Sequence, residues 1–412
     1  MRELLRREFL AARSALTSRF AAFDSPAANF YLILGTTIML VAIGLVMVLS
    51  SSSVSSMTEG GSPFSVFAKQ LTFAVIGLPL MWVCSRLSVR TWKRLAWPAI
   101  LLAVCFQALV FTPLGFGVGG NRNWVNIGGF TAQPSEAAKL ALVVWCALIL
   151  ALKGNRLGEW RELLVPFAPV VLLVLGLVLK GHDLGTGLVL MCLLAAMLFV
   201  AGVRGRLFAL GFGAAATVAA VMVASSANRR ERLSTWLSGE CADIYGTCWQ
   251  STHGLWALAS GGWWGLGLGA SKEKWDWLPE AHNDYIFAII GEELGIPGTF
   301  VILLLFALLA IGCLRIISRH PDPFVKLATT GVMAWVIGQA LMNIGVVIGL
   351  LPVIGVPLPL VSSGGSALIT TLAALGMVLS FARSEPDAGE VLSSPVAVAR
   401  RSSVVTSARS RR

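Results

Sequence analysis

The sequence predicts an all-α membrane protein with about ten transmembrane helices, and two observations support this fold class. Hydrophobic residues make up 56% of the 412 residues and charged residues only 13%, whereas soluble domains carry about 25% charged residues. The apolar residues also form continuous runs close to the roughly 20 residues that a helix needs to cross a bilayer. This composition excludes a soluble enzyme, and runs that do not alternate with polar residues exclude a transmembrane β-barrel.

The apolar runs give the order of the expected helices. They lie at about residues 31–50, 66–85, 95–111, 136–152, 163–180, 184–202, 206–224, 285–311, 325–349 and 364–382. Arginine and lysine gather in alternate loops, at 86–94, 153–161, 204–206 and 315–326. Because cytoplasmic loops are enriched in these residues, we expect both termini in the cytoplasm.

Two tails and one long loop accompany the membrane domain, which we expect at residues 30–383. Residues 1–29 are expected to form a cytoplasmic tail. Residues 384–412, rich in Ser, Ala, Val and Arg, are expected to form a disordered cytoplasmic tail. Residues 225–284, between the seventh and eighth spans, are too long for a connector and predict a large extracellular loop. Its glycines permit tight turns, and its tryptophans suit the water–lipid interface.

The net charge of +11 does not indicate a nucleic-acid partner. The positive residues lie in loops and tails, where attraction to anionic membrane lipid accounts for them. Two of the seven cysteines, Cys241 and Cys248, share the polar outer loop. In an oxidising compartment they form either a local disulfide or two free thiols. No cysteine spacing typical of a zinc site is present, so we expect no metal site of this kind.

Charged residues at membrane depth are unfavourable and therefore mark candidate functional positions. Glu136 and Lys139 begin the fourth span and share a helix face. They form either a local salt bridge or a cation site for an anionic substrate. Arg122, in the loop before that span, is either solvated or a phosphate or sugar contact. Asp183, at the mouth of the sixth span, is either an N-cap or part of the site.

The strongest group of candidates lies in LPEAHNDYIFAIIGEELG, residues 278–295. Asp284 stands where the polar loop becomes an apolar helix. It is either an N-cap or a carboxylate whose burial raises its pKa toward that of a base. Supporting roles are expected of His282, Asn283, Glu292, Glu293 and Lys274. For Glu292 and Glu293 the alternative is simple bonding to neighbouring helices.

Residues 343–367, between the last two spans, are rich in Gly and Pro and hold no charge. Irregular backbone at membrane depth is tolerated only where it lines a cavity or is buried in protein. We therefore expect a re-entrant segment or a cavity wall.

Four ordered strings, QPSEAAKL, GHDLGTG, LPEAHNDYIFAIIGEELG and NIGVVIGLLPVIGVPLPLVSSGGS, resemble the SEDS family of FtsW, RodA and SpoVE over residues 30–383. The third string and the arginine-bearing tails are most similar to the cell-division member. The resemblance implies a peptidoglycan glycosyltransferase of the bacterial cytoplasmic membrane, active at the division septum. Such an enzyme polymerises lipid II at the outer face, releases undecaprenyl pyrophosphate, and works with a class B penicillin-binding protein and other division proteins.

The resemblance also assigns roles to residues. It places the family's essential aspartate at Asp284. Since a single inverting displacement needs one carboxylate base, we expect Asp284 to be that base. It places substrate-binding groups at Arg122, Glu136, Lys139 and Asp183, where the two cations are expected to stabilise the leaving pyrophosphate. The chain departs from the family pattern in three places: Arg122 is followed by Asn123 rather than by a second arginine, and the strings GHDLGT and SSGGSA are variants.

The sequence identifies no cofactor with certainty, and a divalent cation (Mg²⁺ or Mn²⁺) is a candidate to assist the pyrophosphate. Two other functions remain open, a lipid II flippase and a scaffold for division proteins. The candidate residues cluster at the predicted outer face, whereas a transporter site is expected near the midplane. This position favours the polymerase.

Overall fold

The computed structural model describes residues 26–58, 61–118, 121–159, 161–162, 165–238, 246 and 248–385. The tails predicted at 1–29 and 384–412 therefore lie almost entirely outside the described residues. The predicted helical membrane fold is confirmed. Among the described residues, eight helices are long and apolar enough to cross a membrane, and two shorter apolar helices complete the series.

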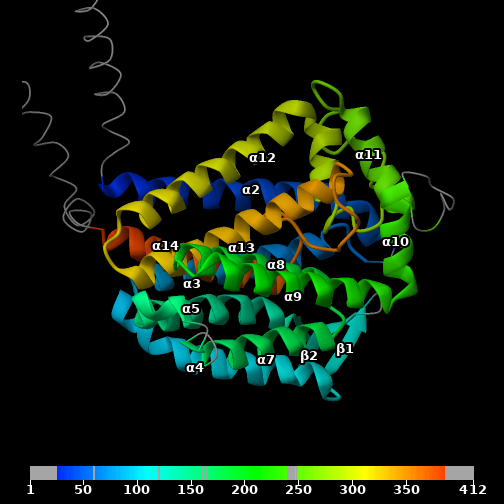
Figure 1. Ribbon diagram of the computed structural model, residues 1–412. Helices are drawn as coiled ribbons and strands as arrows, with labels where there is room; N and C mark the ends of the chain where they lie inside the picture. Colours follow the sequence, from blue (N-terminus) through cyan, green and yellow to red (C-terminus); the bar gives the residue numbers. More distant parts are fainter. Residues whose placement is uncertain are drawn as a thin grey trace, which may run out of the picture.

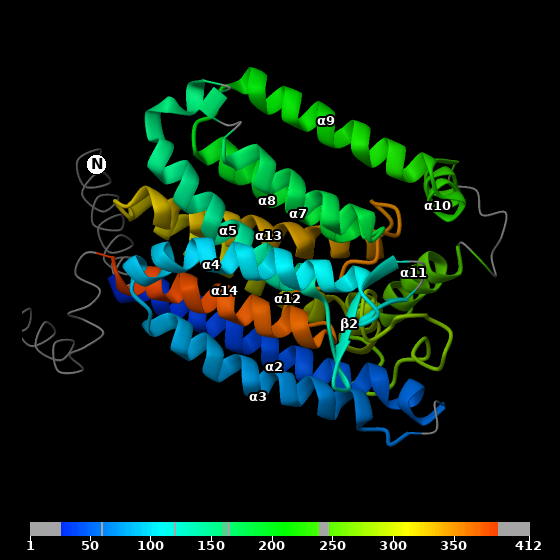
Figure 2. The same cartoon turned by 90° about the horizontal axis from the view of Figure 1, so that it is seen from below.

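The helices follow the order of the apolar runs (Figures 1 and 2). The membrane helices are α2 (Pro26–Thr58), α3 (Ser65–Arg86), α4 (Val89–Ala108), α5 (Pro134–Lys153), α7 (Phe167–Lys180), α8 (Leu184–Val200), α9 (Gly205–Ala224), α12 (Ile286–Arg319), α13 (Pro323–Val347) and α14 (Gly365–Arg383). The outer loop holds α10 (Ala227–Ser238) and α11 (Trp249–Gly261). Two short 3₁₀ turns lie at Leu109–Phe111 and Gly154–Gly158.

Helix α2 continues past the predicted end of the first span through a serine-rich run. The hydroxyl of Ser51 donates to the carbonyl of Met47 at 2.8 Å, and that of Ser52 donates to Val48 at 2.6 Å. Because these side chains bond back to the preceding turn, the polar run stays helical beside other helices.

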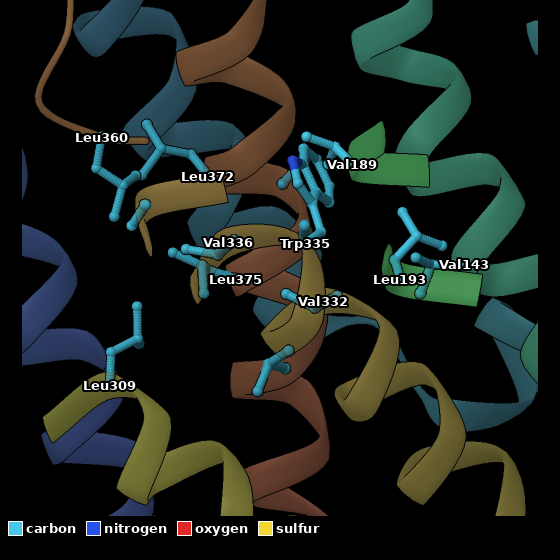
Figure 3. Close-up of a cluster of buried hydrophobic side chains, with 14 of the residues drawn as sticks. Val143, Val189, Leu193, Leu309, Val332, Trp335, Val336, Leu360, Leu372 and Leu375 are labelled. Atoms are coloured by element: carbon cyan, nitrogen blue, oxygen red, sulfur yellow. The ribbon is translucent and has the colours of Figure 1, made fainter. Parts of the chain in front are cut away.

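The core is built around α13, which packs against α5, α8 and α12, while α14 packs on α3. Figure 3 shows Trp335 of α13 between aliphatic side chains of α8 and α14. Helix α9 differs from the other spans, since none of its residues is buried.

The two ends of the bundle differ in content. At one end Asn29 of α2 donates to the Glu385 carboxylate at 3.0 Å, so the two ends of the described chain meet there. At the opposite end lie α10, α11 and a small sheet (Figure 1). The first and last described residues therefore lie at the end of the bundle opposite to the helices of the outer loop. Which side is cytoplasmic stays a prediction from the charge pattern.

The loop before α5 folds as a sheet, which the sequence did not predict. Strands β1 (Gly115–Val118), β2 (Asn121–Ile127) and β3 (Phe130–Ala132) pair antiparallel in the order β1-β2-β3. A two-residue turn joins β2 to β3, and both of its residues, Gly128 and Gly129, have positive φ angles of 60° and 90°. Such angles are typical of the tight hairpin turns that glycine permits.

The outer loop packs tightly on α12 through glycines. Helix α12 is kinked at Gly295, whose φ of 65° and ψ of −158° are not helical. A Cβ at Gly265 would overlap the carbonyl of Glu293, and a Cβ at Gly261 would overlap that of Gly291. Glycine is therefore required for this approach, which brings the loop against the glutamates of α12.

Candidate functional site

Asp284 lies in the turn that leads into α12, at the same end of the bundle as the sheet. Its main-chain carbonyl accepts a hydrogen bond from Nδ2 of Asn343 at 2.7 Å. The same amide donates to the carbonyl of Val356 at 2.7 Å. Asn343 of α13 therefore ties the turn of Asp284 to residues 348–364, which we call the α13–α14 segment.

The residues before Asp284 are held by the same segment. The hydroxyl of Ser363 donates to Oδ1 of Asn283 at 2.9 Å, and the Ser363 N–H donates to the carbonyl of His282 at 3.0 Å. The Ser362 hydroxyl donates to the carbonyl of Asn283 at 2.6 Å. These bonds hold the candidate base against an irregular stretch of chain that is buried at Leu358–Ser362 and more exposed at its start. A small cavity is lined by residues of this segment, by residues of α14 and by Gln339 of α13.

Burial raises the pKa of Asp284 from its ordinary value of 3.8 to about 7. The negative charge of Glu280 also raises the pKa of Asp284, and the positive charge of Arg232 lowers it. Removal from water disfavours the charged carboxylate, and this effect outweighs the nearby cation. A carboxylate with a pKa near the working pH is suited to general base catalysis.

Glu136 and Lys139 form the predicted salt bridge, with Nζ of Lys139 2.8 Å from Oε1 of Glu136. Lys139 also donates to Oε1 of Gln339 at 3.0 Å and lies over the ring of Trp335. Both charged residues are buried, and among the described residues Oε2 of Glu136 has no hydrogen-bond partner. Glu136 and Lys139 thus form a buried ion pair inside the bundle. Direct contact of Lys139 with a substrate stays a prediction.

Helix α13 connects this pair to Asp284. Gln339 and Asn343 are four residues apart and lie on one face. Gln339 donates to the carbonyl of Pro357 at 2.9 Å, next to the Val356 carbonyl that Asn343 holds. Two polar side chains of one helix therefore fix the α13–α14 segment, one beside Lys139 and the other beside Asp284.

Asp183 is the N-cap of α8. Its Oδ1 accepts from the Thr186 N–H at 2.9 Å. Its Oδ2 accepts at 3.0 Å from the amides of both Asn123 and Gln133. Asp183 thus joins the sheet, α8 and the residue before α5. The predicted N-cap is confirmed, and through Gln133 Asp183 also contacts the start of α5, the helix that carries Glu136. A contact between Asp183 and substrate stays a prediction.

Arg122 lies exposed on β2. Its guanidinium donates to the carbonyls of Thr112 at 3.0 Å and Gly115 at 3.3 Å, and its backbone N–H donates to Gly181. These bonds hold the sheet to the α7–α8 loop. A contact between Arg122 and substrate stays a prediction.

The two glutamates of α12 hold the outer loop rather than reaching Asp284. Glu292 accepts from the Ser271 hydroxyl at 2.5 Å and from the Lys272 N–H at 2.8 Å. Glu293 lies 3.2 Å from Nζ of Lys274 and accepts from the Ser50 hydroxyl of α2 at 2.7 Å. Both glutamates therefore bond to neighbouring elements, as the second alternative predicts. Lys274 takes part in the same network through its ion pair with Glu293.

The structure bears on the predicted disulfide of Cys241 and Cys248 only at Cys248, and it leaves the divalent cation untested. Cys248 is buried and disulfide-bonded, but Cys241 lies outside the described residues, so the pairing stays a prediction. Where the chain is described, no three His, Cys, Asp or Glu side chains gather to hold a metal ion. A divalent cation at the pyrophosphate stays a prediction.

Sequence reasoning missed several residues of this region. Gln339 and Asn343 were visible as polar residues four apart in an apolar span, which is a usable signal. Ser362 and Ser363 gave no comparable signal. Arg232 was visible only as part of a basic run, because its position near Asp284 depends on where α10 packs.

Comparison with known proteins identifies the family of the chain. The family model described as cell cycle protein, of FtsW, RodA and SpoVE, matches residues 30–386. A relative in Mycobacterium tuberculosis, named "Probable peptidoglycan glycosyltransferase FtsW", is 40% identical over 373 residues, which cover 90% of this chain and 71% of the relative.

Two solved structures share the fold. One chain comes from a study of the structural coordination of polymerization and crosslinking by a peptidoglycan synthase complex. It matches with a TM-score of 0.69 and 28% identity, covering 85% of this chain and 96% of that chain. The rod shape determining protein RodA of Thermus thermophilus matches with a TM-score of 0.64 and 27% identity, covering 86% and 97%. The chain therefore belongs to the SEDS family of cell cycle proteins, with FtsW, RodA and SpoVE.

Proposed function

We propose that this chain polymerises lipid II into glycan strands at the outer face of the cytoplasmic membrane, with Asp284 as the catalytic base. The chain is a multi-pass membrane protein and a peptidoglycan glycosyltransferase resembling FtsW. The observation that carries the assignment of the base is the placement of Asp284. Its carboxyl lies at the end of the bundle that holds the outer loop, next to the α13–α14 segment, with a pKa of about 7.

The proposed reaction is a single displacement. The carboxylate of Asp284 takes the proton from a sugar hydroxyl of one lipid-linked disaccharide, and that oxygen attacks the anomeric carbon of another. The bond from the anomeric carbon to the phosphate oxygen breaks, and undecaprenyl pyrophosphate leaves with the electron pair. One carboxylate is sufficient because the anomeric carbon inverts and no covalent intermediate with the enzyme forms.

The remaining site residues position this chemistry. The buried Glu136–Lys139 pair places one cation next to Gln339 and hence next to the α13–α14 segment. Through these contacts Lys139 and Gln339 fix the α13–α14 segment. Asp183 sets the start of α8 and, through Gln133, the entry of α5.

We also propose a class B penicillin-binding protein as the partner that cross-links the strands, and the division septum as the place of action. The support is the match to a chain of a peptidoglycan synthase complex whose study concerns polymerization and crosslinking, together with the similarity to a relative named FtsW.

The test of the function uses the full-length protein in liposomes with labelled lipid II. The cognate penicillin-binding protein is added with its transpeptidase blocked, so that strands are not cross-linked. We expect glycan strands on a gel from the wild-type protein and none without it. An intact complex that makes no strands, yet moves labelled lipid II across the bilayer, would replace this proposal with the flippase.

A further inference from the structure

Helix α10 of the outer loop is fixed over the site at two points. Near its start, the guanidinium of Arg229 donates to the carbonyl of His182 at 2.6 Å, directly before Asp183. Near its end, Nε1 of Trp236 donates to the carbonyl of Gly349 at 3.0 Å, at the beginning of the α13–α14 segment. The helix therefore bridges two elements of the candidate site. Figure 1 shows it at the same end of the bundle as the sheet and α11.

Arg232 lies on the face of α10 that these two contacts turn toward the membrane domain. It is three residues after Arg229 and four before Trp236, spacings that place all three side chains on one side of a helix. Arg232 is half-buried. It is close enough to Asp284 and Tyr285 for its charge to act on both.

The guanidinium of Arg232 is uncommitted, in contrast to the cations that the sequence singled out. No salt bridge or hydrogen bond is found for it in the described part of the chain. Lys139 is buried against Glu136 and Gln339, and Arg122 is bonded to two carbonyls. A half-buried guanidinium with its donors free, near enough to the proposed base for its charge to act on it, is suited to bind an oxyanion.

We propose that Arg232 binds the pyrophosphate of the lipid-linked substrate beside Asp284. This assignment rests on the proposed function. The absence of a direct ion pair between Arg232 and Asp284 fits the chemistry, because the base and the leaving group lie on opposite sides of the anomeric carbon in an inverting displacement. Arginine then neutralises the charge that gathers on the pyrophosphate as the bond to the sugar breaks.

The ligand chemistry is a phosphate oxyanion, which the head group of a bilayer phospholipid also offers. The experiment therefore measures binding of undecaprenyl pyrophosphate to the full-length protein in phosphatidylcholine nanodiscs, by native mass spectrometry. Neutral undecaprenol is the control ligand, and phosphatidylglycerol is added as the competing phospholipid.

The variants are Arg232→Gln, Arg232→Lys and the matched control Arg230→Gln. Arg230 is exposed on the same helix, and its guanidinium donates to the carbonyl of Ala224 at the end of α9. Its substitution therefore also removes one positive charge from α10, but at a position distant from Asp284. We expect Arg232→Gln to weaken pyrophosphate binding on the order of 10- to 100-fold and to leave undecaprenol unaffected. Arg232→Lys should retain part of the affinity, and Arg230→Gln should resemble wild type.

Three results would overturn the inference. Equal losses in Arg232→Gln and Arg230→Gln would indicate a general effect of surface charge. Displacement of undecaprenyl pyrophosphate by phosphatidylglycerol at equal amounts would assign the site to bilayer lipid. Unchanged affinity with a rate profile shifted to higher pH would show that Arg232 acts only on the pKa of Asp284. Polymerisation by the wild-type protein is measured in the same preparations. If the wild type makes strands, these outcomes bear on Arg232 alone, and if it makes none, the proposed function itself fails.

Discussion

Replacing Lys274 by methionine tests how the outer loop is held on the bundle. Nζ of Lys274 lies 3.2 Å from Oε1 of Glu293, and the two side chains are 5% and 0% exposed. The ammonium also donates to the carbonyl of Gly269 at 2.6 Å. Methionine keeps most of the side-chain volume but leaves the Glu293 carboxylate buried without its cation.

The expected loss of stability is about 3 kcal/mol. Removing one partner of a buried ion pair costs about 3–5 kcal/mol, because the remaining charge is left uncompensated. The lower value applies here because Glu293 keeps the hydroxyl of Ser50 at 2.7 Å. The double variant Lys274→Met with Glu293→Gln should lose less than the single variant, since its buried amide is neutral.

The assay is thermal unfolding of the purified full-length protein in detergent, with hydrogen exchange of residues 262–275 as the local measure. Lys272→Met is the matched control. Lys272 is exposed, and its backbone N–H rather than its ammonium bonds Glu292 at 2.8 Å. We expect Lys274→Met to lower the apparent Tm by several degrees and Lys272→Met to leave it unchanged. Equal Tm values for the two variants would refute the reasoning.

The remaining predictions concern the base, its support and the outer-loop thiols. The polymerisation rate should fall as the pH drops through about 7, since Asp284 must lose its proton to act. Glu280→Gln should move this decline to lower pH by removing a charge that raises the pKa, and an unmoved pH–rate profile would contradict this. Asn343→Leu removes the amide that bonds the carbonyls of Asp284 and Val356. In steady-state kinetics it should lower kcat on the order of 10-fold with KM little changed. A change confined to KM would argue against a positioning role for Asn343. Intact mass after alkylation without reductant should show that Cys241 and Cys248 are protected, and full alkylation would exclude their disulfide.

Most of the fold could be predicted because a membrane span is a local property of the chain. Hydropathy identified α7 and α8, although each is shorter than a full span. The Glu136–Lys139 pair was accessible for the same reason, since residues three apart on a helix are neighbours whatever surrounds them.

The parts that were missed depend on long-range contacts. Lys274 and Glu293 meet across the loop that returns to α12, and no local pattern links them. The sheet before α5 is short and rich in glycine, which gives a weak strand signal. Arg232 acquires its position only from the packing of a polar helix, and polar helices carry no apolar periodicity to predict their partners.

The most direct test of the central claim compares lipid II polymerisation by the wild-type protein and by Asp284→Asn at pH 8. The variant keeps the shape of the side chain and the carbonyl that Asn343 bonds, but it cannot accept the proton. We expect the rate to fall about 10²- to 10⁴-fold while the protein remains folded and still binds undecaprenyl pyrophosphate. Equal rates for the two proteins would contradict the assignment of Asp284 as the base.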